Sequence, residues 1–189
     1  GKFMKDFEVY MTDQFPLRDT FRKLKAKVHF DIYNQSDNGG IYVKDGYVSK
    51  IDSVYSESST EHFTDGMTNL YNMYLKDNDC KVYYSIIPDK NYYLAGEDYP
   101  TMDYDKLYEK VRNDLSFMTE IDIKDTLTKE SFYFTDTHWR QEKITATAEK
   151  IRKEMGMAPL GEYKEENAGD FYGVYYGQSA LPLPSESIS

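Results

Sequence analysis

The Asp-x-His pattern formed by Asp136 and His138 is the clearest candidate for acid–base chemistry in this chain. A carboxylate two residues before a histidine can accept a hydrogen bond from the Nδ1–H group of the imidazole. That contact leaves Nε2 free to take a proton, and it stabilises the imidazolium ion that results. A histidine held in this way is a general base for a hydroxyl nucleophile. The same spacing also has a plainer interpretation, in which Asp136 caps the following helix and His138 is a surface or packed residue.

Three other residues are candidates for substrate binding. Trp139, the only tryptophan, could form the apolar floor of a sugar site or could belong to the core. Lys90 could orient a carboxylate or polarise an acyl oxygen, or it could be an ordinary solvated lysine. Arg140 is the third candidate, because it belongs to the same polar cluster as Trp139.

The spacing of ligand-type residues predicts neither a metal site nor a cofactor. No HExxH-like pattern is present. Cys80 is the only cysteine, which excludes an internal disulfide and a Cys/His zinc cluster. His29 and His62 are expected to be structural. A metal-dependent hydrolase that uses Asp136 and His138 as ligands stays open as an alternative.

The elements that carry these residues indicate an α/β domain. Runs of β-forming residues at 81–87, 118–123 and 132–134 alternate with helical patterns, which predicts βαβ units and a mostly parallel sheet. Ligands bind beyond the carboxyl ends of the strands in such sheets, and Lys90 and Asp136 fall there. Four apolar stripes mark the expected helices: Leu17, Phe21, Leu24 and Val28; Phe63, Met67, Leu70 and Tyr74; Tyr104, Leu107, Val111 and Leu115; and Ile144, Ala148, Ile151 and Met155.

The 189 residues are predicted to form one domain with three parts. Residues 1–57 would hold an N-terminal helix and a β-hairpin, whose turn is marked by the Asp-Gly pair at 45–46. Residues 58–160 would form the βαβ core. Residues 161–189, rich in Gly, Pro, Ser and Tyr, would be an irregular tail, so the sheet is expected to be incomplete at its C-terminal side.

The composition excludes several classes of function. Apolar residues make up 40% of the chain, which excludes a disordered chain of the low-hydrophobicity type. The net charge of −10 predicts repulsion of phosphate backbones and anionic lipid, so a nucleic-acid partner is not expected. The sequence contains no run of about 18 apolar residues that would form a transmembrane segment. Because the chain starts with Gly-Lys, a signal or anchor segment is expected to have been removed.

Five short segments carry a resemblance that extends over nearly the whole chain. They are 13–19 (DQFPLRD), the hairpin at 41–48, 86–90 (IIPDK), 135–139 (TDTHW) and the helix that follows residue 139. In this order they resemble the DHHW protein family and the alginate O-acetylation proteins of the AlgX/AlgJ type, which belong to the SGNH hydrolase-like group.

The resemblance implies a three-layer αβα, SGNH/flavodoxin-like fold with a mostly parallel sheet, in which Asp136 and His138 correspond to the catalytic acid and base. It also implies acetyl transfer or removal on a cell-envelope polysaccharide, with a serine as the nucleophile. Two positions depart from the family pattern. Thr137 stands where the DHHW name implies histidine, and no strand followed by a nucleophilic serine occurs after residue 140. Ser179 is a candidate only by composition.

Two explanations of the missing serine stay open: a truncated chain, or a member that lost its nucleophile and kept the fold for binding. The sequence therefore predicts an SGNH-like protein with little or no activity alone. The alternative is a non-catalytic module that binds a glycan or an envelope protein. The expected partners are a polysaccharide or acetylated glycan and envelope acetylation-machinery proteins. The expected location is extracellular or in the cell envelope.

Overall fold

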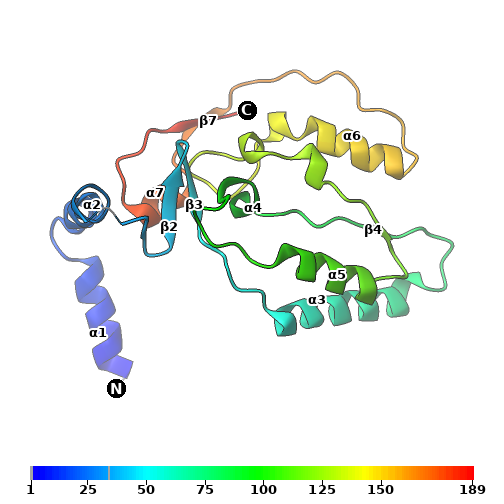
Figure 1. Ribbon diagram of the computed structural model, residues 1–189, viewed down its shortest axis with the longest axis horizontal. Coiled ribbons are helices and arrows are strands. Elements are labelled where there is room, and N and C mark those ends of the chain that lie inside the picture. The colour runs from blue at the N-terminus through cyan, green and yellow to red at the C-terminus, as the bar shows by residue number, and fades with distance from the viewer. Residues whose placement is uncertain (1, 34) are drawn as a thin grey trace.

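The computed structural model describes residues 2–33 and 35–189, which form a mixed α/β structure (Figure 1). The α-helices are α1 (Lys2–Asp13), α2 (Arg18–Lys27), α3 (Glu57–Leu70), α4 (Lys90–Leu94), α5 (Tyr104–Asp114), α6 (Thr145–Glu154) and α7 (Val174–Ser179). The strands are β1 (Asp37–Asn38), β2 (Ile41–Lys44), β3 (Tyr47–Lys50), β4 (Tyr83–Tyr84), β5 (Thr119–Glu120), β6 (Gly169–Phe171) and β7 (Glu186–Ile188). Short π-helical segments are η1 (Val28–Ile32) and η2 (Tyr71–Leu75), and short 3-10 segments are η3 (Lys124–Thr126), η4 (Lys129–Ser131) and η5 (Gln141–Lys143).

The predicted hairpin is confirmed by the antiparallel pair β2–β3, in which Val43 lies opposite Val48. Its two-residue turn consists of Asp45 and Gly46, with φ of 51° and 82°. A turn with two positive φ angles matches the right-handed twist of the flanking strands, and aspartate and glycine tolerate those angles. The hairpin packs on the C-terminal part of the chain, because Val48 is buried against Tyr175 of α7.

The predicted helix at 104–115 is confirmed as α5. The carboxylate of Asp103 caps it by accepting the backbone N–H of Lys106 at 2.9 Å. Its apolar stripe faces inward, where Val111 and Leu115 form a buried cluster with Met118. Burying each such side chain contributes about 1.5–3 kcal/mol relative to leaving it exposed. This cluster fixes α5 next to β4 and β5.

Helix α3 is confirmed as a helix, but the prediction of its buried face was wrong in part, because only Met67 of the apolar stripe packs against the core cluster of Val111. Phe63 and Leu70 of the apolar stripe are exposed, whereas Thr60 and Thr64 are buried. The Thr64 hydroxyl donates a hydrogen bond of 2.7 Å to the carboxylate of Asp114 on α5. The neighbouring helix supplies a polar partner, so the threonine face turns inward.

The α/β class is confirmed, whereas the described strands form three small sheets in place of one continuous sheet. The pair β4–β5 is parallel, with Tyr83 opposite Thr119, and it lies within the two predicted strands at 81–87 and 118–123. The third predicted strand, at 132–134, was wrong. These residues make only an isolated antiparallel bridge between Phe132 and Trp139. A three-layer parallel sheet therefore stays a prediction.

The C-terminal part from 161 was predicted to be irregular, and this was also wrong in part. Strands β6 and β7 pair antiparallel, with Asp170 opposite Ser187, and α7 lies between them in sequence. At the other end of the chain, α1 and α2 project from the body of the molecule (Figure 1). The apolar stripe predicted for α2 is present in a helix, but Phe21 and Leu24 are exposed.

In the described parts of the chain, no helix combines the length and the apolar character that crossing a lipid bilayer demands.

Candidate active site

Asp136 and His138 lie at the tip of a small hairpin-like turn, here called the site loop (residues 132–140). The bridge between Phe132 and Trp139 closes the loop, and the backbone N–H of Tyr133 donates to the carbonyl of His138 at 3.1 Å. The loop follows the 3-10 segment η4 and precedes η5. It therefore presents both residues on a tight turn, rather than at the carboxyl end of a parallel strand as predicted.

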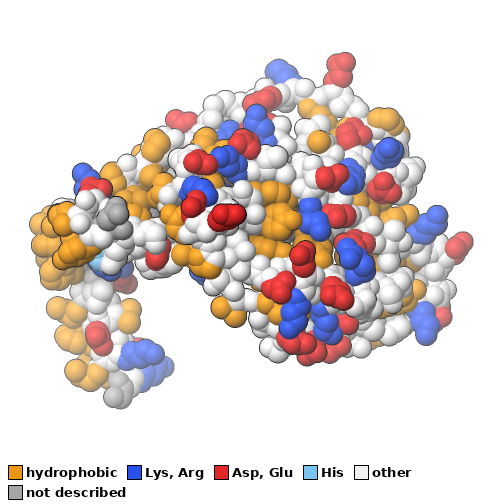
Figure 2. All heavy atoms as spheres, viewed as in Figure 1, with side chains coloured by type: hydrophobic (Ala, Val, Ile, Leu, Met, Phe, Trp, Pro, Cys, Tyr) orange, Lys and Arg blue, Asp and Glu red, His pale blue; other side chains and the backbone are white. Residues whose placement is uncertain are grey.

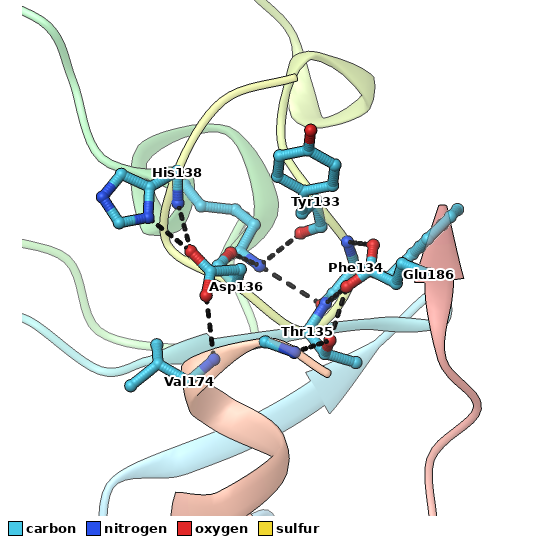
Figure 3. Close-up of polar contacts among 9 residues, drawn as sticks. Tyr133, Phe134, Thr135, Asp136, His138, Val174 and Glu186 are labelled. Atoms are coloured by element: carbon cyan, nitrogen blue, oxygen red, sulfur yellow. Dashed lines mark hydrogen bonds and ion pairs between the residues drawn. The ribbon is translucent and has the colours of Figure 1, made fainter. Parts of the chain in front are cut away.

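One carboxylate oxygen of Asp136 organises His138 twice (Figure 3). Oδ1 accepts the backbone N–H of His138 at 3.0 Å and lies 2.6 Å from its Nδ1. The first contact is the local turn that aspartate favours with the residue two positions later, and the second is the contact that the Asp-x-His pattern predicts. The other oxygen, Oδ2, accepts the backbone N–H of Val174 at 2.8 Å. Because the carboxylate can only accept, the neutral form of the imidazole carries its proton on Nδ1 and has its lone pair on Nε2.

The protonation state of Asp136 is set by these donors. Burial raises the pKa of the carboxyl group, but the N–H groups of His138 and Val174 and the imidazole act in the opposite direction. Together they hold the pKa of Asp136 below its usual range. Asp136 is therefore a carboxylate at neutral pH, as an orienting group for histidine requires.

The two residues differ sharply in exposure. The side chain of Asp136 is 12% exposed, whereas that of His138 is 79% exposed. No hydroxyl group in the described ranges 2–33 and 35–189 hydrogen-bonds with the His138 ring. Ser179 is fully buried, and its hydroxyl bonds only with the backbone at Tyr176 and Leu181. The Ser179 hydroxyl thus bonds with the backbone at the end of α7 and does not contact His138.

Lys90, predicted to bind substrate, lies beneath the site loop. It is 1% exposed, and its Nζ donates to the carbonyl oxygens of Tyr133 at 2.8 Å, Phe134 at 3.3 Å and Asp136 at 2.6 Å. Helix α4 places it there, since Asp89 caps this helix by accepting the N–H at position 92. Lys90 thus holds three carbonyl groups of the site loop in place.

Burial lowers the pKa of Lys90 to about 7, although the carboxylates of Glu186 and Asp136 act in the opposite direction. The free energy of unfolding is therefore expected to rise with pH between about 7 and the ordinary lysine value of about 10.5. In this window the native state has released a proton that the unfolded state still binds, so stability increases by up to about 1.4 kcal/mol per pH unit. Urea unfolding across this range should show the rise in the natural protein and not in Lys90→Met. Equal slopes would show that the pKa of Lys90 is ordinary in the folded protein.

Glu186 binds the backbone of the site loop at residues 134 and 135, and the sequence analysis did not identify it. It is 6% exposed, and its carboxylate accepts the backbone N–H of Phe134, the N–H of Thr135 at 2.6 Å and the Thr135 hydroxyl at 2.5 Å (Figure 3). Glu186 comes from β7, about fifty residues later in the chain. Its sequence surroundings gave no signal, because a glutamate among serines in a tail is typical of solvated chain.

Gly173 is a second residue that the sequence analysis did not identify. Its position allows no side chain, because the backbone of Thr135 lies too close. The Thr135 hydroxyl accepts its N–H at 3.0 Å, and a Cβ at this position would lie 2.2 Å from the carbonyl oxygen of Thr135. Only glycine lets α7 approach the loop closely enough for Val174 to reach Asp136. The sequence shows only a glycine before a short apolar segment. Such a glycine more often caps a helix than allows a helix to contact a neighbouring loop.

A cavity of about 270 Å³ opens beside the imidazole. Trp139 contributes to its wall and also packs against the core cluster that contains Ile123. It is therefore partly a core residue, and its role as the floor of a sugar site stays a prediction. The hydroxyl of Tyr133 is buried and lacks a hydrogen-bond partner among the described residues. The remaining lining residues are Asp136, His138, Gln141, Phe171 and Ile188. The cavity therefore has aromatic walls and one basic group, the exposed imidazole.

Arg140 lies close to the loop but is already engaged. Its Nε donates to Glu142 at 2.5 Å, and its guanidinium lies over the ring of Tyr133 at 5.1 Å. It does not line the cavity next to His138. Arg140 and Lys90 thus support the loop, whereas Trp139 and His138 face the cavity.

Within residues 2–33 and 35–189, no three His, Cys, Asp or Glu side chains are grouped closely enough to hold a metal ion.

Comparisons with known proteins identify the fold. No protein-family model matches the chain, and no curated protein matches it. Among solved structures, a DHHW family protein from Eubacterium siraeum DSM 15702 matches with 20% sequence identity and a TM-score of 0.61, covering 80% of this chain and 54% of that one. Bacillus cereus PatB1 matches at 14% identity and a TM-score of 0.49, covering 78% and 56%. The chain spans about half the length of the solved structures it matches, and it shares the fold of a DHHW family protein.

Proposed function

We propose that this chain provides the acid–base half of a Ser-His-Asp acyl-transfer site, with His138 as general base and Asp136 as the carboxylate that orients it. The observation that carries this proposal is the 2.6 Å contact from a buried carboxylate to the Nδ1 of an exposed imidazole that lines a cavity. Nε2 has no hydrogen-bond partner among the described residues, and the ring is largely exposed. Among the histidines in the described ranges, His138 is the only one whose ring bonds with a carboxylate.

In the proposed reaction, Nε2 of His138 takes the proton of a hydroxyl group as its oxygen bonds to the acyl carbon. Asp136 stabilises the imidazolium ion, which then returns the proton to the leaving oxygen. We assign the serine nucleophile to a further part of a longer protein, in keeping with the half-length match to the solved structures. In that protein, additional strands would complete a three-layer SGNH-like sheet.

The proposed substrate is an O-acetylated polysaccharide of the cell envelope, either as acceptor or as ester. The aromatic wall supports this substrate class, because flat sugar faces pack on rings such as Trp139. Lys90 and Arg140 are assigned to loop positioning in place of substrate binding, since their charged groups already bond with protein atoms. Extracellular location and a role beside envelope acetylation proteins belong to the same proposal.

An organophosphonate that labels activated serines tests the enzymatic proposal in the full-length natural protein. We expect one labelled serine, and we expect His138→Ala to slow both labelling and aryl-acetate hydrolysis at least about a hundredfold, the usual contribution of a general base. His62→Ala is the matched control, because His62 is exposed on α3 and far from the loop in sequence. Hydrolysis that survives His138→Ala unchanged would end the acyl-transfer proposal.

A second candidate function is a non-catalytic glycan-binding module. The cavity with its aromatic wall favours it, together with the lack of a hydroxyl bonded to His138 among the described residues. Binding of an acetylated glycan without turnover, lost in Trp139→Ala and kept in His138→Ala, would support this module. Serine labelling that depends on His138 would instead decide for the enzyme.

A further inference from the structure

The charge of the chain is distributed unevenly between its two ends. Residues 2–27 contain seven Lys and Arg against four Asp and Glu, a net charge of +3. Residues 28–189 contain sixteen against twenty-nine, a net charge of −13. The overall value of −10, which predicts repulsion of anionic surfaces, is therefore an average that does not describe the first two helices. We call residues 2–27 the helical arm.

Helix α1 of the arm buries none of its residues, although it is rich in apolar side chains. Figure 2 shows these hydrophobic side chains gathered over the projecting arm. Phe3 is 75% exposed and Tyr10 is 61% exposed. The other strongly exposed apolar residues of α1 are Met4, Phe7, Val9 and Met11. An unpartnered apolar surface of this kind on a projecting helix marks an interaction site.

Helix α2 has opposite faces with opposite roles. Ala26 is fully buried and faces the body of the molecule. About half a turn away, Phe21 and Leu24 face outward, and they are 54% and 58% exposed. At 100° per residue, Lys25 and Lys27 flank this apolar stripe on either side, and neither forms an ion pair within the described ranges. An apolar stripe edged by lysines is the pattern of helices that lie on membrane surfaces.

The shape of the apolar surface favours a broad partner over a single helix. A groove of about 980 Å³ runs between α1 and α2, with Phe7, Met11 and Phe21 among its lining residues. Phe3 and Leu24 are exposed but lie outside that groove. A helix bound in the groove would leave them in water, whereas a planar apolar layer would cover them as well.

We infer that the helical arm lies on the surface of an anionic lipid bilayer. Its apolar side chains enter the boundary between headgroups and acyl chains, and its lysines contact lipid phosphates. The acidic remainder, with its net charge of −13, is repelled by the same surface. Attraction at one end and repulsion at the other would orient the molecule, with the arm on the lipid and the body turned toward water. This inference does not depend on the acyl-transfer proposal.

Flotation of the full chain with lipid vesicles tests the inference. We expect binding to vesicles of phosphatidylcholine with phosphatidylglycerol, weaker binding to phosphatidylcholine alone, and release by added salt, which screens the attraction. Reversing three arm lysines, Lys23→Glu with Lys25→Glu and Lys27→Glu, should weaken binding at least about tenfold, since each contributes on the order of a fivefold change. Phe21→Ser with Leu24→Ser should weaken it comparably.

The matched control carries Lys76→Glu, Lys81→Glu and Lys153→Glu, three exposed lysines outside the arm with the same change in net charge. It should bind the anionic vesicles far better than the arm variant. Equal losses in both variants, or no flotation of the natural chain at low salt, would overturn the inference. A dimer that Phe21→Ser with Leu24→Ser dissociates, without any vesicle binding, would show that a second copy covers the arm instead.

Discussion

Gly173→Ala is expected to lower the free energy of unfolding by about 3 kcal/mol or more, a large effect for the addition of one methyl group. The new Cβ would lie 2.2 Å from the carbonyl oxygen of Thr135 and 2.6 Å from the backbone nitrogen of Asp136. Backbone atoms cannot move aside as a flexible side chain does. Helix α7 must therefore shift away, and the N–H of Val174 then leaves the carboxylate of Asp136. Urea unfolding measures the loss as a lower midpoint at an unchanged slope.

Gly177→Ala is the matched control within the same helix. Nothing lies within 4 Å of the Cβ that it would add, and alanine is the better helix former, so it should be neutral or stabilise by up to about 1 kcal/mol. Gly173 has an ordinary φ of −68°, so a difference between the two variants would report contact and not backbone strain. Similar midpoints for both would mean that α7 is not held against the site loop.

Glu186→Ala is expected to cost about 3 kcal/mol or more as well. It removes the acceptor of the buried backbone N–H of Thr135 and of the part-buried N–H of Phe134, and each buried group left unpaired costs about 1–3 kcal/mol. The Thr135 hydroxyl loses its partner at the same time. Chemical unfolding gives the cost, and slower serine labelling in the full-length protein would show that the loop no longer presents His138.

Glu186→Gln keeps one acceptor oxygen and should therefore recover part of the lost stability. Glu166→Ala serves as the comparison at an exposed position, since the Glu166 side chain is 70% exposed and pairs only with Lys164 at the surface. Its effect should stay within about 0.5 kcal/mol. If Glu186→Ala were as mild as Glu166→Ala, the carboxylate would not be clamping the loop.

The parts of the structure that sequence reasoning predicted correctly depend on neighbours along the chain. The contact of Asp136 with His138 spans two residues, and the turn at Asp45 and Gly46 follows from the φ angles that these residues tolerate. Helix α5 likewise shows its inward stripe in its own sequence. Local rules suffice wherever both partners lie within one turn.

The parts that were missed depend on partners far away in sequence. Lys90 reaches carbonyl groups 43 to 46 residues later, and Glu186 reaches amides 51 and 52 residues earlier. Neither the residue type nor its neighbours in sequence distinguish a buried lysine or glutamate from a solvated one. No sequence pattern therefore predicts their burial. Helix α3 shows the same limit, because the hydrogen bond from Thr64 to Asp114 decided which face turned inward.

The site loop has a consequence for the order in which the protein folds. Its carbonyl and amide groups are bonded to Val48, Lys90, Tyr175 and Glu186, four positions spread over most of the chain. During synthesis the imidazole at 138 therefore leaves the ribosome long before the last of its supports exists. Contacts of such long sequence separation form late, because the chain must close large loops first. The nascent protein would thus acquire an ordered histidine only once residue 186 has emerged.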